Sequence, residues 1–156
     1  MKKILIILLA FASIHVTAQE EKEAVMKVVN QVFEAMRKND STLLKNCFVE
    51  SPNTFTSFTN PEGISTLTKG DFQQFINAIG RPKEQVLNEP IWNEKVEIDD
   101  NLASVWVDYA FYIGDQFSHC GVDAFHLVKL DNEWKIFHLV DTRRRKDCEI
   151  PEGIKP

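Results

Sequence analysis

Three long runs in the second half of the chain alternate apolar with polar side chains and are rich in valine and aromatic residues. They predict strands over Leu102–Ile113, Phe117–Leu130 and Glu133–Thr142, because β-branched and aromatic residues favour a pleated, half-buried surface. Gly114-Asp115-Gln116 and Asp131-Asn132 separate the runs and are polar, turn-forming breaks. We therefore expect the three strands to form consecutive antiparallel hairpins.

The first half of the chain carries helical periodicity instead. Between Glu20 and Lys38, apolar side chains recur every three or four positions, which predicts an amphipathic helix. Asp40 is the expected N-cap of a short second helix through Asn46. Thr68 with Asp71 resembles a capping box that starts a third helix, which Gly80 ends.

Two shorter runs complete the pattern. Thr54–Phe58 and Ile91–Ile98 have the β-branched and aromatic content of strands, and residues 83–90 are expected to form a loop. Helices grouped before a run of hairpins indicate an α+β fold, in which a curved antiparallel sheet wraps around the N-terminal helices.

The N-terminus has the pattern of a secretory signal peptide. Met1–Lys3 is positively charged, Ile4–Ala12 is apolar, and Val16-Thr17-Ala18 provides tolerated residues before Gln19. The alternative is an uncleaved membrane anchor, which needs an apolar run of roughly 18–20 residues. The apolar run Ile4–Ala12 is shorter than that. We therefore expect an exported protein, periplasmic or secreted, that is cleaved after Ala18 and folds as one domain over residues 19–156.

The charge of the chain disfavours two classes of partner. Cleavage after Ala18 removes Lys2 and Lys3 and changes the formal net charge from −5 to −7. An acidic domain repels nucleic acid and anionic lipid. The one basic cluster, Arg143–Lys146, is followed at once by Asp147 and Glu149, so we interpret it as a solvated strand end. We expect no nucleic-acid partner and no membrane association after cleavage.

The order of elements and the ending FHLVKLDNEWKIFHLVDTRRR resemble the nuclear transport factor 2-like superfamily, on its SnoaL-like and ketosteroid-isomerase-like side. Trp134 and Ile136 match the Trp-x-Ile that the last strand of this superfamily typically carries. The resemblance covers residues 20–145. It implies a cone-shaped sheet, helices on the concave face, an apolar pocket at the open end, and homodimers formed through the outer face.

Two-residue or three-residue turns would set the register of the hairpins. Tyr112 then opposes Ser118, Val107 opposes Asp123, and Leu130 opposes Glu133. On the last two strands, Phe125 opposes His138 and Asp123 opposes Val140. One face then holds Val105, Val107, Tyr109, Phe111, His119, Asp123, Phe125, Leu127, Trp134, Ile136, His138, Val140 and Thr142.

Asp123 and His138 are the candidate catalytic residues on this otherwise apolar face. An acid in an apolar setting must be paired or have a raised pKa, and a carboxylate beside an imidazole can transfer protons. The alternative is that the pair only orients the sheet, or that Asp123 accepts from helix backbone amides. The candidate ligand-binding residues are Tyr109, Phe111, His119, Phe125 and Trp134.

A register slip of one residue would exchange the faces. Asp108, His126 and Asp141 would then point inward. In the favoured register they lie on the outer face, where Trp106, Tyr112 and Phe137 form an aromatic patch. Such a patch is typical of a protein–protein contact, although scattered surface aromatics are also normal.

The three cysteines allow one disulfide in an oxidising compartment. Cys120 opposes Arg143 in the favoured register, and Cys148 follows after a polar stretch that can turn back. We predict a Cys120–Cys148 disulfide, with Cys47 free and buried. No spacing typical of a metal site, a phosphate loop or a dinucleotide site occurs, so we expect no metal and no cofactor.

Three functions remain open. The first, which we favour, is an exported domain that binds a small apolar or aromatic molecule. The second is a cofactor-independent isomerase or dehydratase in which Asp123 or His138 removes a proton next to a carbonyl and Tyr109 or His119 stabilises the oxyanion. The third is a homodimeric interaction module with a filled pocket.

Overall fold

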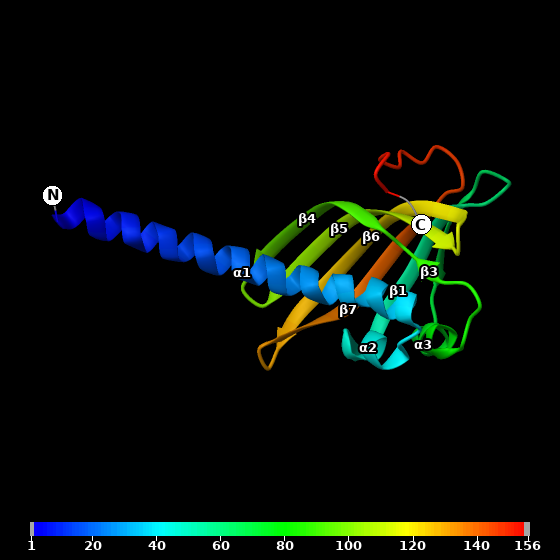
Figure 1. Cartoon of the computed structure of the whole chain (residues 1–156), viewed down its shortest axis with the longest axis horizontal. Coiled ribbons are helices and arrows are strands. Elements are labelled where there is room, and N and C mark those ends of the chain that lie inside the picture. Colours follow the sequence, from blue (N-terminus) through cyan, green and yellow to red (C-terminus); the bar gives the residue numbers. More distant parts are fainter. Residues whose placement is uncertain (1, 155–156) are drawn as a thin grey trace.

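The computed structural model describes residues 2–154, and their side chains from Ala18 onwards (Figure 1). Three helices precede most of the strands. The helices are α1 (Lys2–Lys38), α2 (Ser41–Asn46) and α3 (Phe72–Gly80). The strands are β1 (Phe48–Thr59), β2 (Ser65–Lys69), β3 (Leu87–Asn88), β4 (Ile91–Asp99), β5 (Leu102–Ile113), β6 (Gln116–Leu130) and β7 (Glu133–Arg143).

The strands form one curved, unclosed sheet. Its order is β2-β1-β7-β6-β5-β3, and β4 pairs with β5 beside β3. Every pair is antiparallel except β1 with β7, which run parallel. The predicted α+β fold is confirmed, while the parallel β1–β7 pair corrects the expectation of a wholly antiparallel sheet. Strands β1 and β7 are far apart in the sequence and no turn links them, so no local sequence pattern predicts that they pair.

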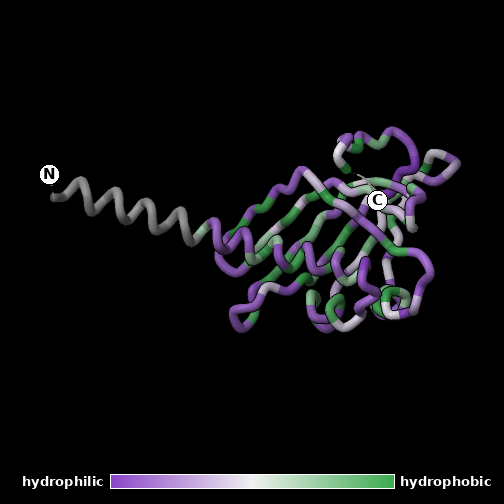
Figure 2. The backbone as a smooth tube through the Cα atoms, viewed as in Figure 1, coloured by the Kyte–Doolittle hydropathy of each residue, from purple (hydrophilic) through white to green (hydrophobic). Residues whose placement is uncertain are grey.

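All three helices pack on the concave face of the sheet (Figure 1). Val25, Val29 and Val32 of α1 are almost fully buried against strand residues such as Leu127 and Ile136. Figure 2 shows the corresponding alternation of hydrophobic and hydrophilic residues along the strands, with hydrophilic connections between them. Burial of these side chains supplies the main stabilisation of the fold.

Several boundaries differ from the sequence-based expectation. Helix α1 begins at Lys2 rather than Glu20, and no glycine or proline interrupts it. The N-cap of α3 is Asp71, which accepts a hydrogen bond from Gln74 N at 3.0 Å. Thr68 lies in the extra strand β2, so its predicted capping role is wrong. The expected N-cap Asp40 is confirmed, because it accepts from Leu43 N at 2.8 Å.

Two strands, β1 and β3, include residues that were not predicted to be extended. Strand β1 begins at Phe48 and continues past Pro52, with an irregular register between Phe48 and Asn53. Strand β3, Leu87–Asn88, lies inside the segment expected to be a loop.

The predicted signal peptide falls mainly on residues whose side chains lie outside the described part of the chain, so it stays a prediction. Within the part of the chain that is described, no helix is both long and apolar enough to span a membrane.

The register of each hairpin agrees with the prediction on one side of a bulge and differs from it by one residue on the other side. Val107 opposes Asp123 as expected, but a bulge places Tyr112 opposite Phe117 rather than Ser118. A second bulge, at Phe137, shifts the far part of β7 by one residue. Leu130 therefore opposes Glu133 as predicted. Beyond the bulge, Phe125 opposes Leu139 rather than His138, and Asp123 opposes Asp141 rather than Val140.

The cysteine prediction is confirmed. Cys120 and Cys148 form a disulfide, and Cys47 is free and buried. Cys120 bridges to Arg144 rather than Arg143, which is the same one-residue shift.

Candidate functional site

A cavity of about 330 Å³ lies between the helices and the concave face of the sheet. Its wall is mostly apolar, and its polar side chains come from β1, β5, β6, β7 and the segments before α3 and β4. The lining residues are Val32, Phe33, Met36, Thr54, Phe55, Thr56, Gly70, Asp71, Phe75, Ala78, Ile79, Leu87, Glu89, Tyr109, Phe111, His119, Asp123, Leu139, Asp141 and Arg143.

Two carboxyl groups meet in this cavity. Asp123 is only 4% exposed, and its side chain is hydrogen-bonded to that of Glu89. Such a bond needs a proton on one of the two carboxyls. Burial, and then the charge of Glu89, raise the pKa of Asp123 well above its usual value. Burial also raises the pKa of Glu89 to about 7, so Asp123 is the proton donor of the pair near neutral pH.

A third acid in the cavity, Asp141, has ordinary partners. Thr56 Oγ1 donates to Asp141 Oδ1 at 2.6 Å, and Arg143 Nε donates to Asp141 Oδ2 at 2.5 Å. These bonds tie β1 to β7 at the edge of the cavity. They also engage Nε of Arg143, the one arginine or lysine among the described residues that line the cavity.

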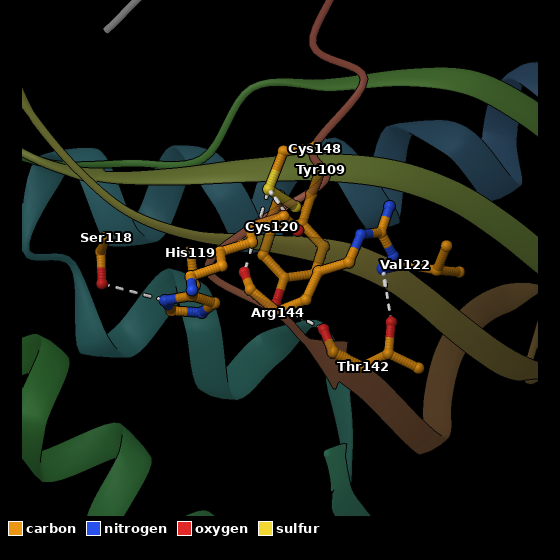
Figure 3. Close-up of a disulfide and its surroundings, with 9 residues drawn as sticks. Tyr109, Ser118, His119, Cys120, Val122, Thr142, Arg144 and Cys148 are labelled. Carbon is orange, nitrogen blue, oxygen red and sulfur yellow. Dashed lines mark hydrogen bonds between the residues drawn. A yellow bond between two sulfur atoms is a disulfide. The ribbon is translucent and has the colours of Figure 1, made fainter. Parts of the chain in front are cut away.

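Tyr109 and His119 lie together at the same end, near the disulfide (Figure 3). The Tyr109 hydroxyl donates to the Thr142 carbonyl at 2.9 Å, and burial raises its pKa. His119 Nδ1 lies 3.0 Å from Ser118 Oγ. Burial, and then the charge of Arg143, lower the pKa of His119 to about 4, so its imidazole is neutral at pH 7.

The structure brings together only part of the predicted site. Tyr109, Phe111, His119 and Asp123 line the cavity, as expected. Phe125 instead lies in the core, where its ring packs edge-on against Phe33 at 6.1 Å.

Trp134 is also a core residue rather than a ligand-binding one. It is buried, and its indole Nε1 donates to Glu21 at 3.0 Å. Lys129 Nζ donates to the same carboxylate at 2.7 Å. This contact fixes α1 to the β6–β7 hairpin.

The predicted Asp123–His138 pair is wrong. His138 opposes His126, and their Nδ1 atoms lie 3.1 Å apart on the outer face of the sheet. The cause is the bulge at Phe137, because one extra residue turns every later side chain of β7 to the other face. The same bulge makes wrong the expectation that His126 and His138 point to opposite faces.

Sequence reasoning missed Glu89, Thr56, Asp141 and Arg143 as cavity residues. Asp141 appeared as an inward acid only in the alternative register, together with Asp108 and His126. The structure takes a mixed form: the bulge turns Asp141 inward, while Asp108 and His126 stay on the outer side of β5 and β6. Glu89 had no signal, since it lies between strands.

Among the described residues, no group of three or more His, Cys, Asp or Glu side chains is arranged to hold a metal ion. The polar end of the cavity offers hydrogen bonds and proton transfer.

Comparison with known proteins identifies the fold. A family model described as "Putative lumazine-binding" matches residues 20–140. No curated protein matches the chain. Many solved structures do, at low sequence identity.

Three of these structures illustrate the range. A nuclear transport factor 2-like protein of unknown function from Shewanella baltica is 20% identical, covers 81% of this chain and 96% of its own, with a TM-score of 0.62. A "putative dehydratase" from Streptomyces avermitilis is 14% identical, covers 83% and 99%, with a TM-score of 0.61. The beta subunit of a "putative aromatic-ring-hydroxylating dioxygenase" from Novosphingobium aromaticivorans is 9% identical, covers 83% and 93%, with a TM-score of 0.67. At these identities the likeness establishes the nuclear transport factor 2-like fold.

Proposed function

This chain belongs to the family described as "Putative lumazine-binding", and from that membership and its cavity we propose that it binds a small, largely aromatic molecule. The observation that carries the proposal is the cavity of about 330 Å³ with the buried carboxyl of Asp123 in its wall. Ligand sites combine apolar walls with a few placed polar groups, and sites of roughly 300–1,000 Å³ hold drug-sized molecules. The size favours a compact ligand.

The polar groups define how such a ligand lies. Its flat body packs against Phe33, Phe75 and Phe111, and its hydrogen-bonding edge faces Asp123 and Glu89. The filled-pocket hypothesis does not agree with this cavity.

Lumazine is the first probe, because it is flat and has hydrogen-bonding groups on its edge. Calorimetric titration of the chain beginning at Gln19 should give one site per chain. Asp123→Asn should weaken binding by about tenfold, the value of one good hydrogen bond to a buried group. Asp108→Asn is the matched control, because Asp108 bonds to Asn93 at 2.8 Å outside the cavity.

A broader screen guards against the wrong choice of probe. Uncharged aromatic fragments, tested by ligand-observed NMR, should include molecules that compete for one site and lose binding in Asp123→Asn. If neither lumazine nor any fragment binds the wild-type chain at millimolar concentration, the binding proposal is wrong.

A second function, proton transfer without a cofactor, is favoured by one observation. Glu89 has a pKa raised to about 7 and lies beside a protonated carboxyl, which suits a general base near neutral pH. Glu89 therefore takes the role of general base that the sequence analysis gave to Asp123 or His138. Glu89 would remove a proton next to a carbonyl, and Asp123 would donate a hydrogen bond to the resulting enolate oxygen.

Deuterium exchange tests this second function. In D₂O, 2-indanone should exchange its α-protons faster with the wild-type chain than without it, and Glu89→Gln should remove the acceleration. Glu97→Gln, on β4 outside the cavity, should leave it unchanged. Equal exchange with the wild type and Glu89→Gln would exclude this function for the probe.

We also propose that the chain is exported and cleaved after Ala18. The N-terminal pattern supports this, and so does the Cys120–Cys148 disulfide, because such bonds persist in oxidising compartments. Intact mass of the protein from the producing cells should correspond to a chain that begins at Gln19. A mass that retains Met1–Ala18 would contradict the proposal.

A further inference from the structure

The charges that line the cavity do not balance. Asp141 is paired with Arg143, whose Nε lies 2.5 Å from its carboxylate. Glu89 and Asp123 have no basic partner among the described residues, and the imidazole of His119 is neutral at pH 7. The acids are therefore in excess among the described residues that line the cavity, and Nε of Arg143 is bonded to one of them, Asp141.

Asp123 is also unusual in its surroundings. It is 4% exposed, and no N–H or hydroxyl group of a described residue donates to it. Its hydrogen-bond partner is the carboxyl of Glu89, to which it donates its own proton. Buried carboxylates are normally paired with a cation or with several donors. Here a proton held between two acids takes the place of a counter-ion, which leaves this position open to a cation.

The walls suit the same kind of ligand. Phe75 and Phe111 line the cavity together with the ring of Tyr109. The faces of aromatic rings attract cations, most strongly where water is excluded. Aromatic walls with an unpaired carboxyl pair favour a positively charged group on a flat body.

We propose that the natural ligand of this cavity carries a cationic nitrogen group, of the amidinium or amine class, that binds between Asp123 and Glu89. The proposal rests on the binding function above and specifies the charge of the ligand. On binding, the shared proton leaves to solvent and the two carboxylates face the N–H groups of the ligand. A phosphate or carboxylate ligand is disfavoured, because it would face the unpaired acids Asp123 and Glu89.

The test uses three probes of one shape and three charges: benzamidine is a cation, benzamide is neutral and benzoate is an anion between pH 6 and pH 8. At pH 8, NMR titration of the chain beginning at Gln19 should give an affinity for benzamidine at least about tenfold higher than for benzamide. Benzoate should bind most weakly. Benzamide that binds as tightly as benzamidine would overturn the proposal.

The pH dependence provides a second readout. Benzamidine binding should tighten by at least about tenfold from pH 6 to pH 8, because burial raises the pKa of Glu89 to about 7 and the cation binds the ionised form. Tyr109, with its raised pKa, and neutral His119 keep their charge over this range. Benzamide binding should be nearly independent of pH, and an equal response of both probes would contradict the assignment.

Two conservative variants assign the effect to the carboxyl pair. Asp123→Asn and Glu89→Gln should each reduce the affinity for benzamidine to about that for benzamide, and Glu97→Gln should change neither. Unchanged preference in both cavity variants would overturn the proposal. If benzamide and lumazine bind but benzamidine does not, the proposed positive charge of the ligand is wrong and the binding function stands. If none of these probes binds, the binding function itself is wrong.

Discussion

The two faces of the sheet place like groups opposite each other on the same pair of strands, with different outcomes. On the concave face Asp123 opposes Asp141, and on the outer face His126 opposes His138. Asp123 is buried and retains a proton, whereas the half-buried Asp141 accepts from Thr56 and Arg143. The outer imidazoles are partly exposed, and one donates to the other over 3.1 Å.

The difference shows that burial, more than proximity, decides the chemistry of a like-charged pair. Burial and then the neighbouring His126 lower the pKa of His138, but solvent can still reach it. Desolvation disfavours the charged form of a group, so the buried acid Asp123 changes its protonation state. We therefore propose that the concave face carries the proton and ligand chemistry and that the outer face forms the contact between copies.

The largest expected effect concerns the close packing of the concave face. A Cβ on Gly121 would lie 1.8 Å from the Thr142 carbonyl oxygen and 2.9 Å from the Tyr109 ring. Gly121→Ala should lower the free energy of unfolding by about 3–5 kcal/mol, because backbone must move. Urea denaturation measures this. Gly153→Ala, with open space around it, should change stability by less than about 0.5 kcal/mol.

The next effect concerns the outer side of β6, at Cys120. Its disulfide closes a segment with a sequence separation of 28, so Cys148→Ser should lower the free energy of unfolding by about 3–4 kcal/mol. Dithiothreitol should destabilise the wild type to the level of Cys148→Ser and leave the variant unchanged. A loss under about 1 kcal/mol would mean that the C-terminal segment is held by other contacts.

The titrating groups of the cavity predict an unusual pH dependence. Between pH 5.0 and 6.5, Glu89 and Asp123 hold protons in the folded state that the unfolded chain has largely lost. Each therefore lowers the free energy of unfolding by about 1.4 kcal/mol per pH unit as pH rises. His119, with a pKa lowered to about 4, acts in the opposite direction over this range. The net expectation is a loss of stability of about 1.4 kcal/mol per pH unit.

Removing the acids should reverse this slope. In the double variant Asp123→Asn with Glu89→Gln, His119 remains, so stability should rise with pH up to about 6.5. Urea denaturation at pH 5.0 and 6.5 measures both slopes, and Glu97→Gln should retain the wild-type slope. A double variant that keeps the wild-type slope would show that the acids ionise normally in the folded state.

The sequence predicted the elements well because their signals are local. The strand Leu102–Ile113 has the predicted ends, and its two successors differ from prediction by one residue. Alternation of apolar and polar residues depends only on neighbours along the chain. The helical stripe and the Asp40 cap are local in the same sense.

The site was only half predictable because it depends on two features without a local signal. The sequence around Phe137 alternates like any other strand and gives no sign of a bulge. The bulge nevertheless places Asp141, in place of the predicted His138, on the concave face. Glu89 lies between strands β3 and β4, and only the tertiary fold brings it to Asp123. Asp123, Tyr109, Phe111 and His119 were found because they precede the bulge.

The smallest effect on stability is expected on the outer face, where we predict a homodimer. Trp106 is 48% exposed there, beside the small side chain of Ala124. Trp106→Glu should convert a dimer to a monomer in sedimentation equilibrium and change the unfolding free energy of the monomer by less than about 0.5 kcal/mol. Val86→Glu, at a position 51% exposed and outside the strands, is the matched control and should remain dimeric. If both variants sediment like the wild type, the outer aromatic residues do not form a dimer contact. The two faces of the sheet then differ only in how far solvent reaches their side chains.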